Sequence, residues 1–129
     1  MAESGRYEKT PRPESMIAVR RMLLEHSAVR EYSEPHQQLY AISRFGRGDI
    51  NLYVTNIYTV GVADVQEILD AHPVVNCILT VSAWNNYTSM AKEYAKGVKV
   101  GLFRFYELKG ALNYDGKSFV DYVSPYDRK

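Results

Sequence analysis

The chain has little cysteine, with Cys77 as its only one, and this scarcity limits its chemistry. One cysteine cannot form an intrachain disulfide and cannot supply a zinc site built from several cysteines. Val75, Ile78 and Leu79 surround it in the sequence, which favours a small buried residue over a catalytic thiol, since a thiol nucleophile needs a neighbouring base. This cysteine usage fits a reducing, cytoplasmic setting.

The chain also lacks a charge excess of either sign. Its 129 residues carry 16 Lys plus Arg and 15 Asp plus Glu, for a net charge of +1. A dedicated duplex-DNA binder usually carries more positive charge, so the composition implies no strong non-specific nucleic-acid binding, although it is compatible with a local basic patch. No segment approaches the roughly 20 apolar residues of a membrane span. The start of the chain shows no secretory signal pattern, so we expect no membrane partner.

Motifs that bind phosphate or activate a nucleophile are missing too. The chain has no P-loop segment, no GxGxxG segment and no GxSxG elbow. Its three histidines, His26, His36 and His72, are far apart and form no zinc-binding pattern. We therefore expect no metal, no cofactor and no catalytic residue of these kinds.

The length suits one domain, which we expect to span residues 15–123. Residues 1–14 have few apolar side chains and are expected to form a tail, and residues 124–129 a frayed end. Ser15 is a good N-cap for an amphipathic helix over residues 16–32, which we expect to end before Pro35.

A β-hairpin and then a segment of alternating strands and helices are expected after this helix. Residues 39–45 and 50–60 are rich in β-forming side chains, and the turn at residues 46–49 has two glycines, so an antiparallel hairpin is expected. The periodicity of residues 52–103 then predicts strand, helix, strand, helix and strand, at residues 52–60, 62–71, 77–81, 88–96 and 98–103. Strands joined by helices lie parallel, so the fold class is α/β with a mixed, mainly parallel sheet of four or five strands.

The remaining C-terminal part is less regular. Residues 105–112 fit either a short helix or a continuation of the last strand, and residues 118–123 fit a short edge strand. The chain has 11 Tyr against one Trp, and a tyrosine-rich surface favours contact with partners.

Polar and aromatic side chains gather in the loop at residues 82–88. Ligands of open α/β sheets usually bind beyond the carboxyl ends of the parallel strands, and this loop follows such an end. Two interpretations remain open. The loop binds a ligand, or Ser82 or Asn86 caps the next helix while Trp84 packs down.

Residues 76–112 resemble the C-terminal part of Mrr-like restriction-endonuclease-fold domains. The resemblance depends on the strand 78-ILTVS-82, the helix segment 91-AKEYA-95, the strand 100-VGLF-103 and the pair Glu107-Leu108. It implies a strand ending in a Thr/Ser-rich loop, a helix with an Ala-x-x-x-Ala face, a final strand and a short helix. Together with the strand and helix periodicity of residues 52–103, the resemblance favours a restriction-endonuclease-like or a small Rossmann-like fold.

The resemblance also implies nuclease chemistry, which needs an acidic residue on one strand and an acid-x-Lys pair on the next to hold a divalent ion. Asp49 fits the first position, but residues 52–58 contain neither an acid nor a lysine. The triplet of Glu107, Leu108 and Lys109 lies on a later element. This departure predicts either a degenerate, inactive member of the family or a re-purposed scaffold, without that catalysis.

Three functions remain as hypotheses. The first is a non-catalytic module that binds nucleic acid or a nucleic-acid-processing protein, because aromatic side chains beside cations favour base stacking. Its expected contact residues are Trp84, Asn85, Asn86, Tyr87, Lys92, Lys96 and Lys99, with Arg44 and Arg47 at the hairpin. The second is a small ligand-binding domain or enzyme that uses Asn56, Ser82, Asn85 and Glu107. The third is a protein–protein interaction, such as a homodimer formed through residues 114–126.

Overall fold

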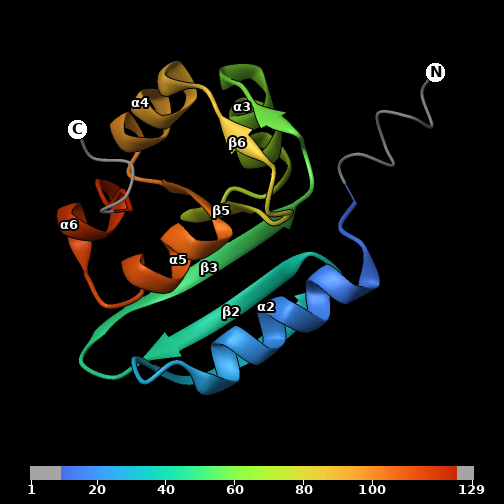
Figure 1. Ribbon diagram of the computed structural model, residues 1–129. Coiled ribbons are helices and arrows are strands. Elements are labelled where there is room, and N and C mark those ends of the chain that lie inside the picture. The colour runs from blue at the N-terminus through green and yellow to red at the C-terminus, as the bar shows by residue number, and fades with distance from the viewer. Residues whose placement is uncertain (1–9, 125–129) are drawn as a thin grey trace.

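A five-stranded mixed sheet organises the chain (Figure 1). The computed structural model describes residues 10–124. Its helices and strands are α2 (Pro13–Glu25), β1 (Val29–His36), β2 (Leu39–Arg44), β3 (Arg47–Thr55), β4 (Thr59–Val60), α3 (Val62–Ala71), β5 (Cys77–Thr80), β6 (Asn86–Tyr87), α4 (Ser89–Gly97), β7 (Gly101–Arg104), α5 (Phe105–Ala111) and α6 (Gly116–Val120).

The strand order is β1-β2-β3-β5-β7. β1, β2 and β3 are antiparallel neighbours, whereas β3, β5 and β7 run parallel, with Leu52 opposite Cys77 and Cys77 opposite Gly101. The expected α/β class, the hairpin and the parallel segment are therefore confirmed.

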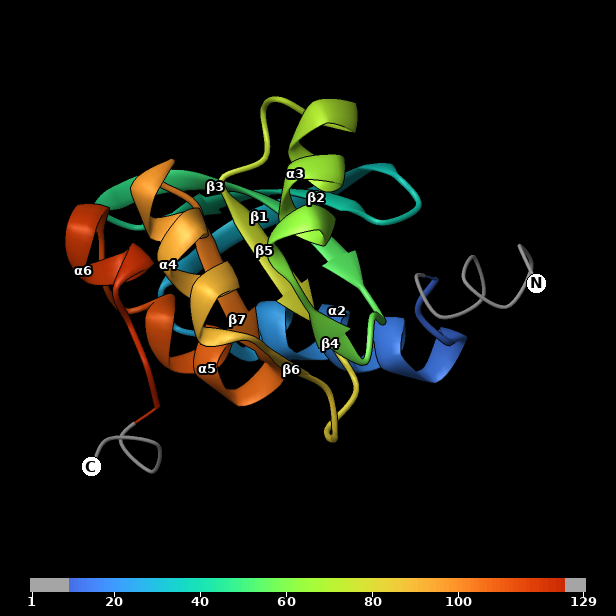
Figure 2. The same ribbon diagram turned by 90° about the horizontal axis from the view of Figure 1, so that it is seen from above.

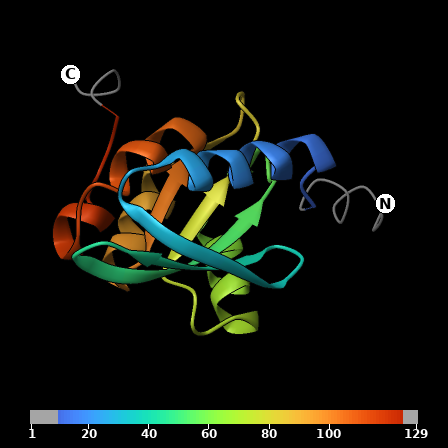
Figure 3. The same cartoon turned by 90° about the horizontal axis from the view of Figure 1, so that it is seen from below.

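Helices cover both faces of this sheet (Figures 2 and 3). Strand side chains alternate between the faces, so Leu52, Leu79 and Phe103 pack toward α2, α5 and α6. Ile78 and Leu102 pack on the other face, against α3 and α4. β5 is buried on both faces, which explains its continuous apolar sequence.

The N-terminal helix differs from the sequence-based expectation at both ends. It begins at Pro13, inside the expected tail, because proline is favoured in the first turn of a helix. It ends at Glu25, and residues 29–36 form β1 instead of continuing the helix. Tyr32 pairs with Ile42 of β2, so strand pairing outweighs the local helical pattern. Pro35 is tolerated because β1 lies at the edge of the sheet.

The expected strand at residues 50–60 is two strands. β3 ends at Thr55, and β4 leaves the main sheet to form a small parallel pair with β6, with Thr59 opposite Asn86. The last strand of the sheet, β7, begins at Gly101 instead of residue 98.

The C-terminal part is helical. Residues 105–111 form α5, which decides between the two expected alternatives. The expected edge strand at residues 118–123 is wrong, because Gly116–Val120 is the helix α6. Its Phe119 is buried against Phe103, with ring centroids 5.2 Å apart, and this core contact fixes the segment.

The expected tail and frayed end lie mostly outside the described residues, which exclude 1–9 and 125–129. Within the described part of the chain, no helix combines the length and apolar character that crossing a bilayer requires.

Candidate functional site

A crevice opens where β5 and β7 end. After β5 the chain leads to α4 on one face of the sheet, and after β7 it enters α5 on the opposite face. Such a divergence between neighbouring parallel strands leaves a ligand-sized gap beyond their carboxyl ends. Here the gap is a cavity of about 300 Å³ that the N-terminal turn of α2 also borders. Its lining includes Arg12, Ser15, Ser82, Trp84, Phe105 and Tyr106. We call it the carboxyl-end crevice.

Aromatic side chains dominate the rim of the carboxyl-end crevice. Trp84 is 62% exposed and Tyr106 is 73% exposed. The backbone N–H of Asn85 donates to the carbonyl oxygen of Ser82 over 2.9 Å, which closes a tight turn with Trp84 inside it. The expectation that Trp84 packs down is therefore wrong. The guanidinium carbon of Arg12 lies 5.9 Å from the Trp84 ring centroid, which is a cation–π distance.

A polar network holds the Trp84 turn to the end of β3. The Asn56 Oδ1 atom accepts hydrogen bonds from Ser82 Oγ over 2.5 Å and from Asn85 Nδ2 over 2.9 Å. Asn85 Nδ2 also donates to Thr80 Oγ1, which in turn donates to the carbonyl oxygen of Ile57. Asn85 is buried, so it anchors the loop instead of facing a partner. The structure thus brings together three residues of the expected ligand site, Asn56, Ser82 and Asn85. Their side chains form hydrogen bonds with one another and hold the loop in place.

The capping of α4 also differs from the expectation. Thr88, and neither Ser82 nor Asn86, is the N-cap of α4, and its Oγ1 accepts from the backbone N–H of Ala91. Asn86 itself is exposed, and its Oδ1 accepts from the Tyr87 N–H.

Glu107 is the centre of a second buried network. It is 1% exposed and accepts from the Tyr87 hydroxyl over 2.8 and 2.9 Å. The backbone N–H groups of Arg104 and Ser124 also donate to it. Burial, and next the neighbouring Glu107 charge, raises the pKa of Tyr87 above its usual value. Tyr87 and Glu107 therefore tie β6 to α5 and the C-terminal segment.

Lys92 is buried, although we expected it on the contact surface. Its Nζ donates to the carbonyl oxygens of Leu102 over 2.6 Å and Tyr122 over 3.1 Å, and lies 4.2 Å from the Phe103 ring centroid. Burial is the main cause that lowers the Lys92 pKa to about 8. The half-buried Lys96 forms an ion pair with Glu93 over 3.4 Å.

The two hairpin arginines are structural as well. The Arg44 side chain is buried and donates to three carbonyl oxygens and to Asp115 Oδ1, and burial lowers its pKa. Arg47 donates to the carbonyl oxygens of Asn113 and Phe45, both over 3.0 Å. Both arginines lie at the turn between β2 and β3, at the opposite end of the sheet from the carboxyl-end crevice. Of the expected contact residues, only Trp84 lines the crevice.

Sequence reasoning did not identify the other side of the crevice as a binding surface. Arg12 lies in the expected tail, and Ser15, which was expected as the N-cap, lies inside α2. Tyr106 lies on α5, where the sequence left a helix and a strand both open. The only local signal was Pro13, which is typical of a helix start.

Three other features considered in the sequence are metal ligands, Asp49 and the expected dimer segment. Residues 10–124 hold no group of three or more His, Cys, Asp or Glu side chains that could bind a metal ion. Asp49 is exposed near the start of β3, away from the carboxyl-end crevice. In the expected dimer segment, Tyr114 and Tyr122 pack on each other with ring centroids 5.5 Å apart, and residues 125 and 126 lie outside the described part.

The chain was compared with protein-family models, curated proteins and solved structures. None of the three comparisons gave a match.

Proposed function

We propose that the chain is a non-catalytic α/β module, derived from a nuclease-like scaffold, that binds single-stranded nucleic acid at the carboxyl-end crevice. The observation that carries this proposal is the exposure of Trp84 beside Arg12, at the place where the sheet topology leaves a ligand-sized gap. An indole ring exposed to water gains from stacking on a base, and a guanidinium next to it suits a phosphate or a second π-face.

A single strand suits the crevice better than a duplex does. Stacking on Trp84 and Tyr106 needs a base whose face is accessible, and the bases of a duplex are already stacked. Among the described residues that line the crevice, Arg12 is the only cation, and the whole chain carries a net charge of +1. Stacking must therefore supply most of the affinity, and its salt dependence should be shallow, with a slope of about −0.7 for one phosphate contact.

The scaffold part of the proposal has support from the elements of residues 76–112. β5 leads to a Ser82-containing loop, α4 buries Ala91 and Ala95 on one side, and β7 leads to the short α5, as the resemblance implies. The catalytic part of that family has no counterpart, because β3 carries neither an acid nor a lysine between residues 52 and 55. These observations favour binding over hydrolysis.

The test uses the only tryptophan of the chain as its reporter. Titration with a short single-stranded oligonucleotide should quench the Trp84 fluorescence, and the matching duplex should quench it far less. For a labelled oligonucleotide followed by anisotropy, Trp84→Ala should weaken binding by about 1–3 kcal/mol, the value of one stacked base.

Phe45→Ala is the matched control. Phe45 is an exposed aromatic residue, like Trp84, but it lies in the turn between β2 and β3 at the far end of the sheet. This variant should bind as the wild type does. Absence of quenching at low salt, or equal loss of binding in both variants, would refute the proposal.

A further inference from the structure

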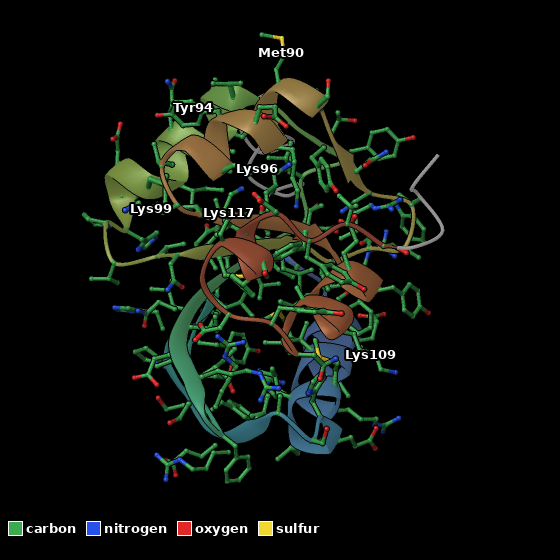
Figure 4. The ribbon with its side chains drawn as sticks, turned by 90° about the vertical axis from the view of Figure 1, so that its left-hand side faces the viewer. Met90, Tyr94, Lys96, Lys99, Lys109 and Lys117 are labelled. Atoms are coloured by element: carbon green, nitrogen blue, oxygen red, sulfur yellow. The ribbon has the colours of Figure 1, made fainter. Side chains whose placement is uncertain are left out.

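A second and larger cavity lies at the amino ends of the parallel strands. Its volume is about 870 Å³, and it is bordered by the start of β3, the end of α4 and the helix α6 (Figure 4). Ile50, Phe119 and Val120 contribute apolar surface to its lining. A cavity of this size accommodates a small organic ligand. We call it the amino-end cavity.

Most charged side chains that line the amino-end cavity are already paired. Arg44 Nη2 lies 3.1 Å from Asp115 Oδ1, and the ion pairs Lys96–Glu93 and Lys117–Asp121 occupy four further groups. Asp49 and Lys99 differ from these. Within residues 10–124 neither side chain has a hydrogen bond or an ion pair, and both border the cavity. The cavity therefore offers one free carboxylate, one free ammonium group and an apolar surface.

The backbone of Lys99 follows from the way α4 ends. Its φ is 63°, in the left-handed region that favours glycine. The Lys99 N–H donates to the carbonyl oxygen of Lys96 over 3.0 Å, and the Val100 N–H donates to that of Ala95 over 2.8 Å. These two bonds form a common C-terminal helix cap with Lys99 at its left-handed position. The cap places Lys99 at the edge of the amino-end cavity.

We propose that the amino-end cavity binds a zwitterionic ligand with an apolar body, of the amino-acid class. The ligand carboxylate pairs with the Lys99 ammonium group, and the ligand ammonium group pairs with the Asp49 carboxylate. The apolar body covers the surface formed by Ile50, Phe119 and Val120. A ligand with one charge alone would leave one of the two free groups without a partner and so bind more weakly. This site is separate from the carboxyl-end crevice, and the inference does not depend on the proposed nucleic-acid function.

The test compares L-leucine with two analogues that each lack one charge. Leucinamide has no carboxylate, and N-acetyl-leucine has no ammonium group. In amide NMR spectra of the full chain, leucine should shift the signals of Asp49, Lys99 and Val120, and each analogue should bind about tenfold more weakly. Lys99→Gln should bind leucine and leucinamide equally. Asp49→Asn should bind leucine and N-acetyl-leucine equally.

Two further variants separate binding from folding. Lys109→Gln removes an exposed lysine of α5 that does not line the cavity, and it should bind leucine as the wild type does (Figure 4). Lys99→Gly removes the ammonium group and the backbone strain together, so it should unfold at a higher temperature yet lose leucine binding. The inference is overturned if leucine shifts neither the Lys99 nor the Asp49 signal, if it shifts only those of residues 82–84, or if leucinamide binds the wild type as tightly as leucine does.

Discussion

Lys92 should make the protein more stable as the pH rises from 7 to 9. Its ammonium group is buried beside Phe103, and this burial lowers its pKa to about 8 from the usual 10.5. Between these two values the unfolded chain binds the proton that the native state releases. The free energy of unfolding therefore rises with pH across this window, whereas a lysine with a raised pKa would give the opposite sign.

The magnitude follows from the two pKa values. Relative to a lysine with the usual pKa, the lowered pKa of about 8 destabilises the native state by about 3 kcal/mol at pH 7 and by about 2 kcal/mol at pH 9. Raising the pH from 7 to 9 should thus add about 1 kcal/mol to the free energy of unfolding through Lys92 alone.

The assay is urea unfolding of the wild type and of Lys92→Met at both pH values. Methionine keeps much of the side-chain length and cannot be protonated, so the difference between the two proteins isolates the titration of Lys92. The same comparison for Lys109→Met, at an exposed lysine of α5, should show no change with pH. If the difference between wild type and Lys92→Met is equal at pH 7 and pH 9, the burial argument for Lys92 is wrong.

Two other predictions concern stability. Tyr87→Phe removes a hydroxyl that donates to the buried Glu107. Urea unfolding should show that the free energy of unfolding falls by about 1–3 kcal/mol. A decrease below about 0.5 kcal/mol would mean that water replaces the hydroxyl. Gly101→Ala should destabilise the fold by about 1–3 kcal/mol, because the added methyl group would lie 2.5 Å from the Phe103 ring. Its matched control is Gly97→Ala at the end of α4, where nothing lies within 4 Å, and thermal unfolding of this variant should show an unchanged or higher midpoint. Equal effects of the two substitutions would contradict the packing of β7.

The sequence predicted the elements that depend on local patterns. Cys77–Thr80 is buried on both faces and reads as a continuous apolar run, and Val65 and Ile68 of α3 keep helical spacing. β1 was missed because its residues continue a helical pattern in the sequence, and only pairing with β2 makes them a strand. Pairing across the sheet is a tertiary effect that no local pattern contains.

In the candidate site, too, features that depend on local sequence were predictable and those that depend on distant residues were not. The loop that holds Trp84 was found from its composition, since polar and aromatic residues follow a buried strand. The burial of Arg44 was not predictable in this way, because one of its acceptors, the carbonyl oxygen of Leu112, is 68 residues away in the chain. Long cationic side chains are normally solvent-exposed, and only distant carbonyl groups make their burial acceptable here.

The form of β1 has a consequence for self-association. This strand is one of the two edge strands of the sheet. Its register with β2 is irregular at two places, and it carries Pro35 near the charged Glu31 and Glu34. An incoming strand would meet a missing N–H at Pro35, repulsion between like charges and an uneven backbone. We therefore expect the hydrogen-bonded ladder to end at β1, with no strand of a second molecule adding to this edge.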